Sequence, residues 1–278
     1  MKEAKSDPST SSETKIEHFD VAQGPDQKSK LISVEEMLLN VGALLMSSGA
    51  STGRVRTTVN RIADALGYNI ELLITNRSLM LKVMDEESDH FMASLKRTSP
   101  HGVNFRVVSG ISRMSWKVVE ENWDIPSINA EIARLVALPH YPRLIILSSV
   151  ALAGSSFCAL FGGKGVELVV AFVATFVGLF VRQESLKKRF NPYVSIFFAS
   201  FAASLLSGLS VRLGIGSSPE VAFATSVLFL VPGVPLINSF TDMIDGNILN
   251  GITRGIHGLI IAFAIALGLL CAKYMFNI

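Results

Sequence analysis

The sequence predicts an α-helical integral membrane protein, with five transmembrane helices preceded by a small cytoplasmic α+β domain. Only 17% of the 278 residues are charged, against about 25% in a typical soluble domain. Residues 1–142 carry 16 basic and 18 acidic side chains, whereas residues 143–278 carry nine and five. Fourteen of the 17 phenylalanines lie in the second stretch. A first part in water and a second part in a lipid bilayer are therefore expected.

Residues 1–30 are polar and lack hydrophobic periodicity, which predicts a disordered tail without the apolar core of a signal peptide. The two cysteines, Cys158 and Cys271, lie inside apolar runs, so packing roles are expected and a disulfide framework is not. The net charge of +2 and the lack of a basic cluster with interleaved aromatics argue against a nucleic-acid partner.

Residues 31–142 show the alternating patterns of a compact α+β domain. Ser33, with Glu36 three residues later, forms a capping box that predicts the start of a first helix, which Gly49 ends. Apolar residues at three- and four-residue spacing predict a second helix over Thr52–Leu66. The further elements expected here are strands at Ile70–Thr75, Leu79–Met84 and Phe91–Arg97, a fourth strand at Phe105–Val108, and helices at Ile111–Asn122 and Ser127–Leu138, the last capped by Ser127.

Residues 143–278 contain five long apolar runs, and a bilayer-spanning helix needs about 20 such residues. The runs are Leu144–Phe161, Val166–Val181, Tyr193–Val211, Val221–Ile237 and Ile256–Phe276. The segment after the second run is the most basic connection, which predicts that it faces the cytoplasm. The N-terminus is then cytoplasmic and the C-terminus lies outside.

A Pro-Gly-x-Pro pattern interrupts the fourth run. Pro232 and Pro235 each remove a backbone donor and clash with preceding carbonyls, and Gly233 adds flexibility. A helix break inside a membrane is tolerated only beside protein or a water-filled cavity. A half-helix starting near Leu236 would direct free N–H groups at the break, which suits a carboxylate. The alternative is a kinked helix that leads into an interfacial amphipathic helix.

Polar residues near this break and at the end of the second run are the remaining candidates for a substrate site or gate. Asn238, Asp242 and Asp245 share one face of the segment after the break. The two aspartates could contact substrate, couple a proton or cation, or be solvated, and a metal site normally needs more ligands. Arg182 and Gln183 are either interfacial anchors or part of a gate.

Enzymatic function has little support in the motifs. Ser47, Ser48, Ser51 and Thr52 surround Gly49, but the sequence has no GxSxG nucleophile elbow. It also has no Walker, GxGxxG, HExxH or CxxC pattern. The protein is therefore expected not to be an enzyme and to need no cofactor or metal. Energy for any transport would come from an ion gradient or a partner.

Two segments resemble the threonine/serine exporter (ThrE) family. Leu38–Tyr68 is similar to the opening helix pair of that family, with a Gly-Ala pair, an Arg-Val pair and an Ala-Leu-Gly stop. Leu230–Gly255 is similar to its Val-Pro-Gly-x-Pro-x-x-Asn stretch and the acidic amphipathic segment that follows. The matching positions are Gly49 and Arg54 in the first segment, and Pro232, Gly233, Pro235, Asn238 and Asp242 in the second. Family members often carry an acidic residue where this chain has Ser51, so no role of that carboxylate can be transferred.

The resemblance covers roughly residues 31–276. It implies a subunit of a secondary-active exporter in the cell inner membrane, driven by the proton motive force. The implied substrates are small carboxylate-bearing metabolites, either threonine and serine or a dicarboxylate such as succinate. Because the apolar runs stop at five, it also implies the split form, in which a separate small membrane subunit completes the transporter. Two other classes stay open: a membrane-anchored enzyme or sensor acting through residues 31–142, and a structural subunit that supports a partner's pore.

Overall fold

The computed structural model describes residues 17–20, 25–85, 91–98, 102–139 and 141–278, and the chain divides into two compact units. The first unit comprises the chain up to Leu138 together with Asn238–Thr253. The second comprises Pro139–Ile237 and Arg254–Ile278. Helices α9 (Gly233–Ile244) and α10 (Ile248–Phe276) therefore contribute residues to both units.

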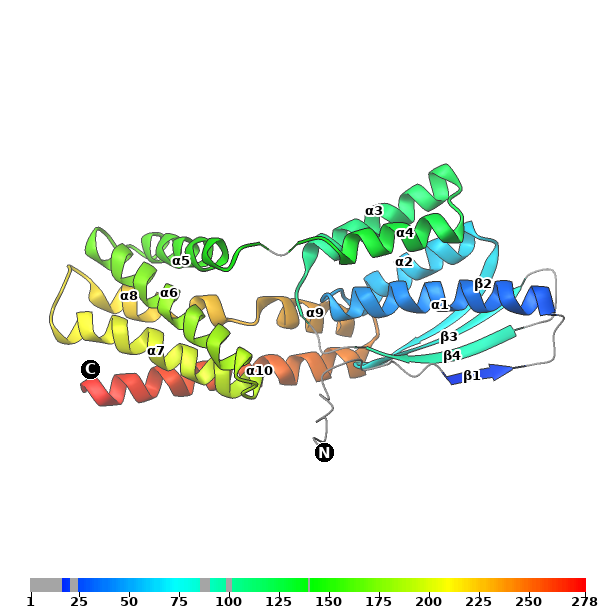
Figure 1. Cartoon of the computed structure of the whole chain (residues 1–278). Helices are drawn as coiled ribbons and strands as arrows, with labels where there is room; N and C mark the ends of the chain where they lie inside the picture. The colour runs from blue at the N-terminus through cyan, green and yellow to red at the C-terminus, as the bar shows by residue number, and fades with distance from the viewer. Residues whose placement is uncertain (1–16, 21–24, 86–90, 99–101, 140) are drawn as a thin grey trace, which may run out of the picture. The chain divides into compact units, whose positions relative to one another are not determined.

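A four-stranded antiparallel sheet with helices along one face builds the first unit (Figure 1). The strands lie in the order β1 (Glu17–Asp20), β4 (Phe91–Arg97), β3 (Ser78–Asp85) and β2 (Tyr68–Ile74). Alternation along β3 turns Leu79, Leu81 and Val83 into the core, where all three are fully buried. Met80 and Leu73 lie on the other face and are exposed.

Four helices of the first unit cover the sheet. They are α1 (Pro25–Ser47), α2 (Thr52–Ala65), α3 (Phe105–Glu121) and α4 (Ile125–Val136). Helix α1 contacts β3 and β4, α2 contacts β2, and α3 packs on α2. Val55, Val59 and Ile62 follow the predicted spacing along α2 and are fully buried. The helix expected over Thr52–Leu66 is thus confirmed to within one residue.

The predicted start of the first helix is wrong. Helix α1 begins at Pro25, so Ser33 lies in its third turn, and the Ser33 hydroxyl donates to the carbonyl of Ser29 at 2.9 Å. A serine that bonds back to its own helix cannot cap that helix. Residues 1–16 and 21–24 of the predicted tail lie outside the described residues, whereas β1 and the first turns of α1 fall within residues 17–30.

Two further local predictions are wrong. Phe105–Val108 opens helix α3 and forms no strand, because Asn104 caps the helix by accepting a hydrogen bond from the Val107 N–H at 3.3 Å. Helix α4 is capped by Asp124, whose carboxylate accepts from the Ser127 N–H at 3.1 Å. Ser127 therefore lies inside that helix. The hydrogen bonds from Ser127 hold the pKa of Asp124 below its usual range.

The second unit is helical in its described residues. It contains α5 (Arg143–Leu160), α6 (Val166–Lys187), α7 (Pro192–Arg212), α8 (Pro219–Thr225) and a short 3-10 helix, η1 (Leu228–Leu230), with parts of α9 and α10. Across the described part of the chain, four helices are long and apolar enough to cross a membrane. A fifth span results if the pair Pro219–Leu230 and Gly233–Ile244, bent by 60°, counts as one.

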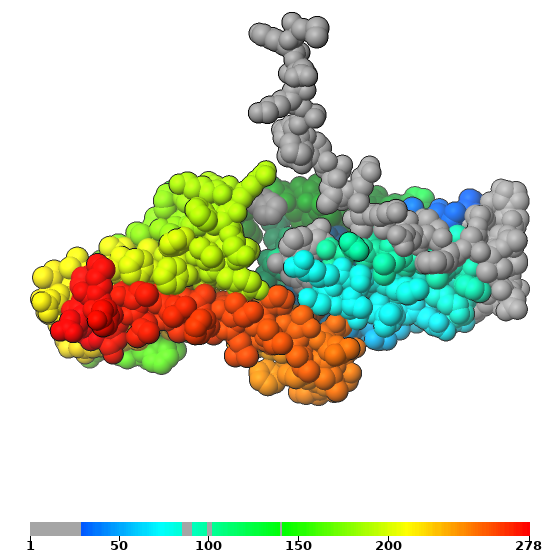
Figure 2. Space-filling view, turned by 90° about the horizontal axis from the view of Figure 1, so that it is seen from below, coloured from blue at the N-terminus to red at the C-terminus, as the bar shows by residue number. Residues whose placement is uncertain are grey.

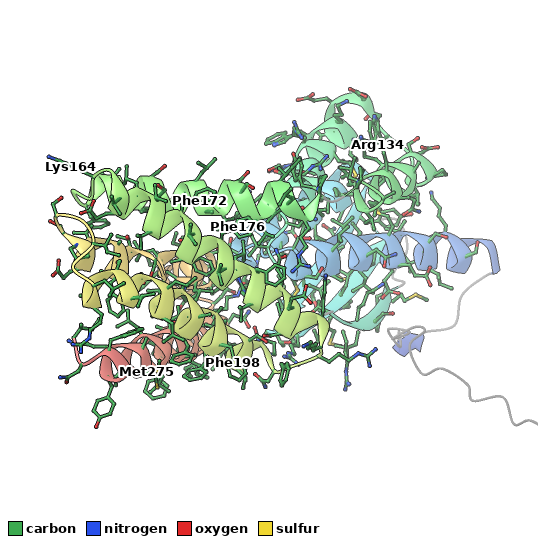
Figure 3. All side chains as sticks on the ribbon, turned by 60° about the vertical axis from the view of Figure 1, so that its left-hand side comes forward. Arg134, Lys164, Phe172, Phe176, Phe198 and Met275 are labelled. Atoms are coloured by element: carbon green, nitrogen blue, oxygen red, sulfur yellow. The ribbon has the colours of Figure 1, made fainter. Side chains whose placement is uncertain are left out.

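Side chains of the second unit divide into a small inner set and a bulky outer set. Gly178 of α6 packs against Ala199 and Ala203 of α7, which brings the two backbones close together. Phe198 of α7 and Met275 of α10 point outward and are exposed (Figure 3). The space-filling view places the orange-to-red part of α10 beside the yellow-green α7 (Figure 2). An apolar outer surface around small inner residues is what a lipid-embedded helical protein requires.

Candidate functional site

A buried carboxylate of α9 lies at the first turn of α2 in the first unit. The backbone N–H of Thr52 donates to Asp242 Oδ1 at 2.8 Å, and the Thr52 hydroxyl donates to Oδ2 at 3.1 Å. Asp242 is fully buried and Thr52 is 1% exposed. The first N–H groups of a helix lack partners within the helix and favour negative charge. Asp242 therefore stabilises the start of α2, and the alternative in which this aspartate is solvated is wrong.

Two asparagines attach the hairpin that α9 and the start of α10 form to neighbouring segments of the first unit. Asn238 Nδ2 donates to the Gly49 carbonyl at 2.8 Å. Asn250, at the start of α10, donates to the Ile74 carbonyl at 2.9 Å and contacts the Thr52 hydroxyl at 3.4 Å. Asn250 was not among the predicted site residues. Its one sequence signal is an amide side chain in an otherwise apolar helix start.

The turn between α9 and α10 makes this hairpin compact. A Cβ atom added at Gly251 would lie 2.5 Å from Met243 Cγ and 2.7 Å from the Ser239 carbonyl oxygen. The Ser239 hydroxyl also donates to the Gly251 carbonyl at 2.7 Å. Only a glycine allows this approach, and the approach fixes the position of Asp242 two residues before the end of α9. Asp245 is exposed at the helix end.

The predicted motif residues of the first segment surround the same place. Gly49 has φ +90°, which permits the turn between α1 and α2. Ser51 caps α2, and its hydroxyl oxygen accepts from the Arg54 N–H at 3.4 Å. The Arg54 side chain is exposed. The structure thus brings Gly49 and Ser51 beside Thr52 and Asp242, while Arg54 enters only through its backbone.

The helix break is present, but its geometry differs from the expectation. Helix α9 begins at Gly233, three residues before the predicted Leu236. The Gly233 N–H donates to the Val231 carbonyl at 2.9 Å, and the Leu236 N–H donates to the Pro232 carbonyl at 3.1 Å. Pro235 has no N–H. The first turn of α9 therefore offers fewer free donors to a carboxylate than predicted.

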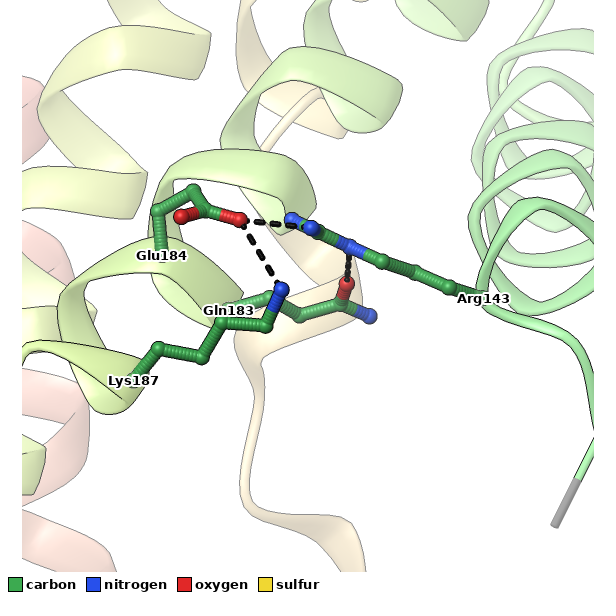
Figure 4. A network of polar contacts seen from close by, with 4 residues as sticks. All are labelled: Arg143, Gln183, Glu184 and Lys187. Atoms are coloured by element: carbon green, nitrogen blue, oxygen red, sulfur yellow. Dashed lines mark hydrogen bonds and ion pairs between the residues drawn. The ribbon is translucent and has the colours of Figure 1, made fainter.

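A charged network lies where α5 begins and α6 ends (Figure 4). Arg143 Nη1 pairs with Glu184 at 2.5 Å, and Arg143 Nε donates to Gln183 Oε1 at 2.6 Å. Lys187 Nζ lies 3.3 Å from the same Glu184 oxygen. The guanidinium also stacks over Phe180, 4.6 Å from the ring centre. Gln183, a predicted gate residue, is thereby placed within an organised polar group.

This network has one more cation than it has carboxylates. Arg143 Nη2 is buried and has no hydrogen-bond partner among the residues that the structure describes. A guanidinium nitrogen in that position can donate to a further acceptor such as a carboxylate. Arg143 was not predicted as a site residue, although a cation at the first position of an apolar run could have suggested it. Arg182, which was predicted, is partly buried and lies outside the four residues of Figure 4.

Comparison with known proteins adds a family and several relatives. The profile of the ThrE family, described as "Putative threonine/serine exporter", matches residues 36–275. The Klebsiella aerogenes protein named "Probable succinate transporter subunit YjjP" is 28% identical over 253 residues, which cover 90% of this chain and 97% of that protein. The Escherichia coli protein of the same name is 27% identical over 242 residues, 86% of this chain and 93% of its own. The Corynebacterium glutamicum "Threonine/serine exporter" is 24% identical over 236 residues, which cover 78% of this chain but 46% of the relative. No solved structure matches.

Proposed function

This chain belongs to the threonine/serine exporter family, and from this we propose that it is one subunit of a secondary-active exporter of small carboxylate-bearing metabolites. The family match supports a transporter role, and the apolar helices support a multi-pass membrane protein. The observation that carries the finer proposal is the 60° bend between the α8–η1 segment and α9. Discontinuous membrane helices are what secondary transporters use to build a substrate site or a gate.

The proposed gate centres on the break. The interruption lies at Val231 and Pro232, whereas Gly233 and Pro235 fall in the first turn of α9. The same helix carries Asn238 and Asp242. Both side chains bond to the Gly49–Thr52 segment of the first unit. Asp245, exposed at the end of α9, completes the polar face of this segment.

The proposed substrate chemistry is that of a carboxylate. The relatives are named for succinate or for threonine and serine, and all three compounds carry at least one carboxylate. Arg143, with its buried and unpartnered Nη2, supplies a donor of the matching charge. Gln183 orients this guanidinium, and Arg182 adds a second guanidinium one residue earlier. Attraction of substrate to this end of α6 follows from the excess positive charge.

The proposed assembly includes a second, smaller membrane subunit. Two relatives that align over nearly their whole length are named as transporter subunits, whereas this chain spans about half of the Corynebacterium protein. We place five spans in the cell inner membrane, counting the bent pair as one. The basic residues Lys187, Lys188 and Arg189 then face the cytoplasm together with the first unit and the N-terminus, and the C-terminus lies outside.

The experiment is an efflux assay in cells that lack their own exporters for the test compounds. Cells are loaded with labelled succinate, threonine or serine, and they express this chain, a small membrane subunit of the same family, or both. The proposal expects faster efflux of one compound class only when both chains are present. Unchanged efflux of all three compounds, with both chains detected in the membrane, would contradict it.

A further inference from the structure

Five of the buried hydroxyl side chains of the second unit lie on α6, on α7 and directly after α8. They are Thr175, Ser200, Ser204, Ser207 and Ser226, and each is fully buried. The Ser207 and Ser226 hydroxyl oxygens are 3.0 Å apart, and the Thr175 hydroxyl donates to the Ser226 carbonyl at 3.4 Å. The three serines of α7 are four and three residues apart, so they share one face of that helix.

Main-chain carbonyls use the hydroxyl protons of four of these five side chains, Thr175, Ser200, Ser207 and Ser226. Ser207 donates to the Ala203 carbonyl at 2.9 Å, and Ser226 donates to the Phe223 carbonyl at 2.9 Å. A hydroxyl group has one proton and two lone pairs. Once the protons are committed, the oxygens present lone pairs only. Such a cluster attracts a positively charged group and repels a carboxylate.

Ser204 supplies an independent observation. Its hydroxyl oxygen is buried and has no hydrogen-bond partner within the described part of the chain. Serines in apolar helices ordinarily bond a carbonyl one turn earlier, as Ser156 does to Leu152 at 2.8 Å. Buried polar atoms are rarely left unmatched. The Ser204 hydroxyl is therefore open to a further contact.

The chemistry of the cluster selects the class of ligand. All its donors are neutral oxygens, whereas divalent metal ions in proteins are held by carboxylates. Helix α8 ends at Thr225, directly before Ser226. Neutral oxygens, in the form of carbonyls of interrupted helices, are known ligands for monovalent cations in transporters. We propose that Thr175, Ser204, Ser207 and Ser226 bind a monovalent cation, either Na⁺ or the ammonium group of a small amine.

This site does not depend on the proposed export function, because binding is measured without transport. The full chain is purified in detergent, and its unfolding temperature is followed as NaCl or methylammonium chloride replaces choline chloride at constant ionic strength. A ligand that binds only the folded state raises this temperature with its concentration. We expect a saturable rise with one of the two probes, and the probe that acts identifies the source of the charge.

Variants locate the site. Ser204→Ala removes a hydroxyl without a partner, so its unfolding temperature in choline chloride should equal that of the wild type or exceed it. The same variant, and Ser226→Ala, should weaken the cation response at least tenfold. Ser156→Ala, which changes an exposed hydroxyl of α5, should leave the response intact. The proposal is overturned if neither probe shifts the wild type, or if Ser204→Ala responds as strongly as the wild type.

Discussion

Asp242 accepts two hydrogen bonds from Thr52, which lies 190 residues earlier in the chain. This contact joins the two segments that resemble the exporter family, Leu38–Tyr68 and Leu230–Gly255. Asn238 adds a third bond to the same place through the Gly49 carbonyl. Gly49, Thr52, Asn238 and Asp242, far apart in sequence, therefore form one structural element of the first unit.

Replacing Asp242 should destabilise this element. Asp242→Ala leaves the N–H and hydroxyl of Thr52 buried without an acceptor, which costs about 1–3 kcal/mol of unfolding free energy. Asp242→Asn keeps the shape and one acceptor, so it should cost less. Thermal unfolding of the purified protein measures both. Asp245→Ala, at an exposed position on the same helix, is the control and should change the unfolding free energy by less than about 0.5 kcal/mol. Equal effects of the two alanine variants would contradict the role of Asp242.

The tight hairpin gives a matched pair of glycine variants. Gly251→Ala should destabilise the first unit, because its new methyl group would approach the Ser239 carbonyl to 2.7 Å and the backbone cannot move away locally. Gly53→Ala also meets an atom, Asp245 Oδ2 at 2.8 Å, but that exposed carboxylate can rotate away. The second change should therefore be neutral or slightly stabilising, since alanine favours a helix. Unfolding temperatures compare the two, and a lower value for Gly53→Ala than for Gly251→Ala would be inconsistent with this packing.

Glu167 holds the loop before α8 in the second unit. Its carboxylate accepts from the Ser217 and Ser218 N–H groups at 2.6 and 2.8 Å, and from the Lys164 N–H at 3.3 Å. Glu167→Ala should lower the unfolding temperature, because these backbone donors lose their acceptor. Glu220→Ala, an acidic residue in the first turn of α8, should have a smaller effect. A larger fall in unfolding temperature for Glu220→Ala than for Glu167→Ala would show that other contacts hold the loop.

The Arg143 network should determine how well carboxylates are captured. Arg143→Gln removes a charge-assisted donor, whose loss costs about 1.5–3 kcal/mol and weakens binding roughly tenfold or more. The substrate concentration for half-maximal efflux should rise accordingly, with a smaller change in maximal rate. Lys188→Gln removes an exposed charge of the same sign nearby and should leave both values unchanged. An unchanged half-maximal concentration in Arg143→Gln would exclude this network as the carboxylate contact.

The sequence predicted those features that depend on residues close together in the chain, such as the position of α2 and the break before α9. The spacing of Val55, Val59 and Ile62 located α2, because a helix buries residues that recur at its own period. Pro232 and Pro235 located the break, because proline cannot continue a helix. Ser33 misled the prediction of the first helix start, since serine followed by an acidic residue also occurs inside helices.

The site was predictable only as a set of candidates. Asn238 and Asp242 stood out as polar residues on an amphipathic segment, but periodicity identifies a buried face and not the distant segment that covers it. The bonds from Thr52 and to the Gly49 carbonyl are therefore products of the tertiary fold. Arg143 was missed because its partners Gln183 and Glu184 lie on another helix, and Gln183 is 40 residues away in the sequence.

The break in the helix is the central claim, and efflux from cells expressing Pro232→Ala together with Pro235→Ala tests it most directly. The second subunit is co-expressed, and rates are compared at equal amounts of protein in the membrane. The account predicts that this double variant folds and inserts but exports at a small fraction of the wild-type rate, because a continuous helix replaces the proposed gate. Full export by the double variant would contradict the claim.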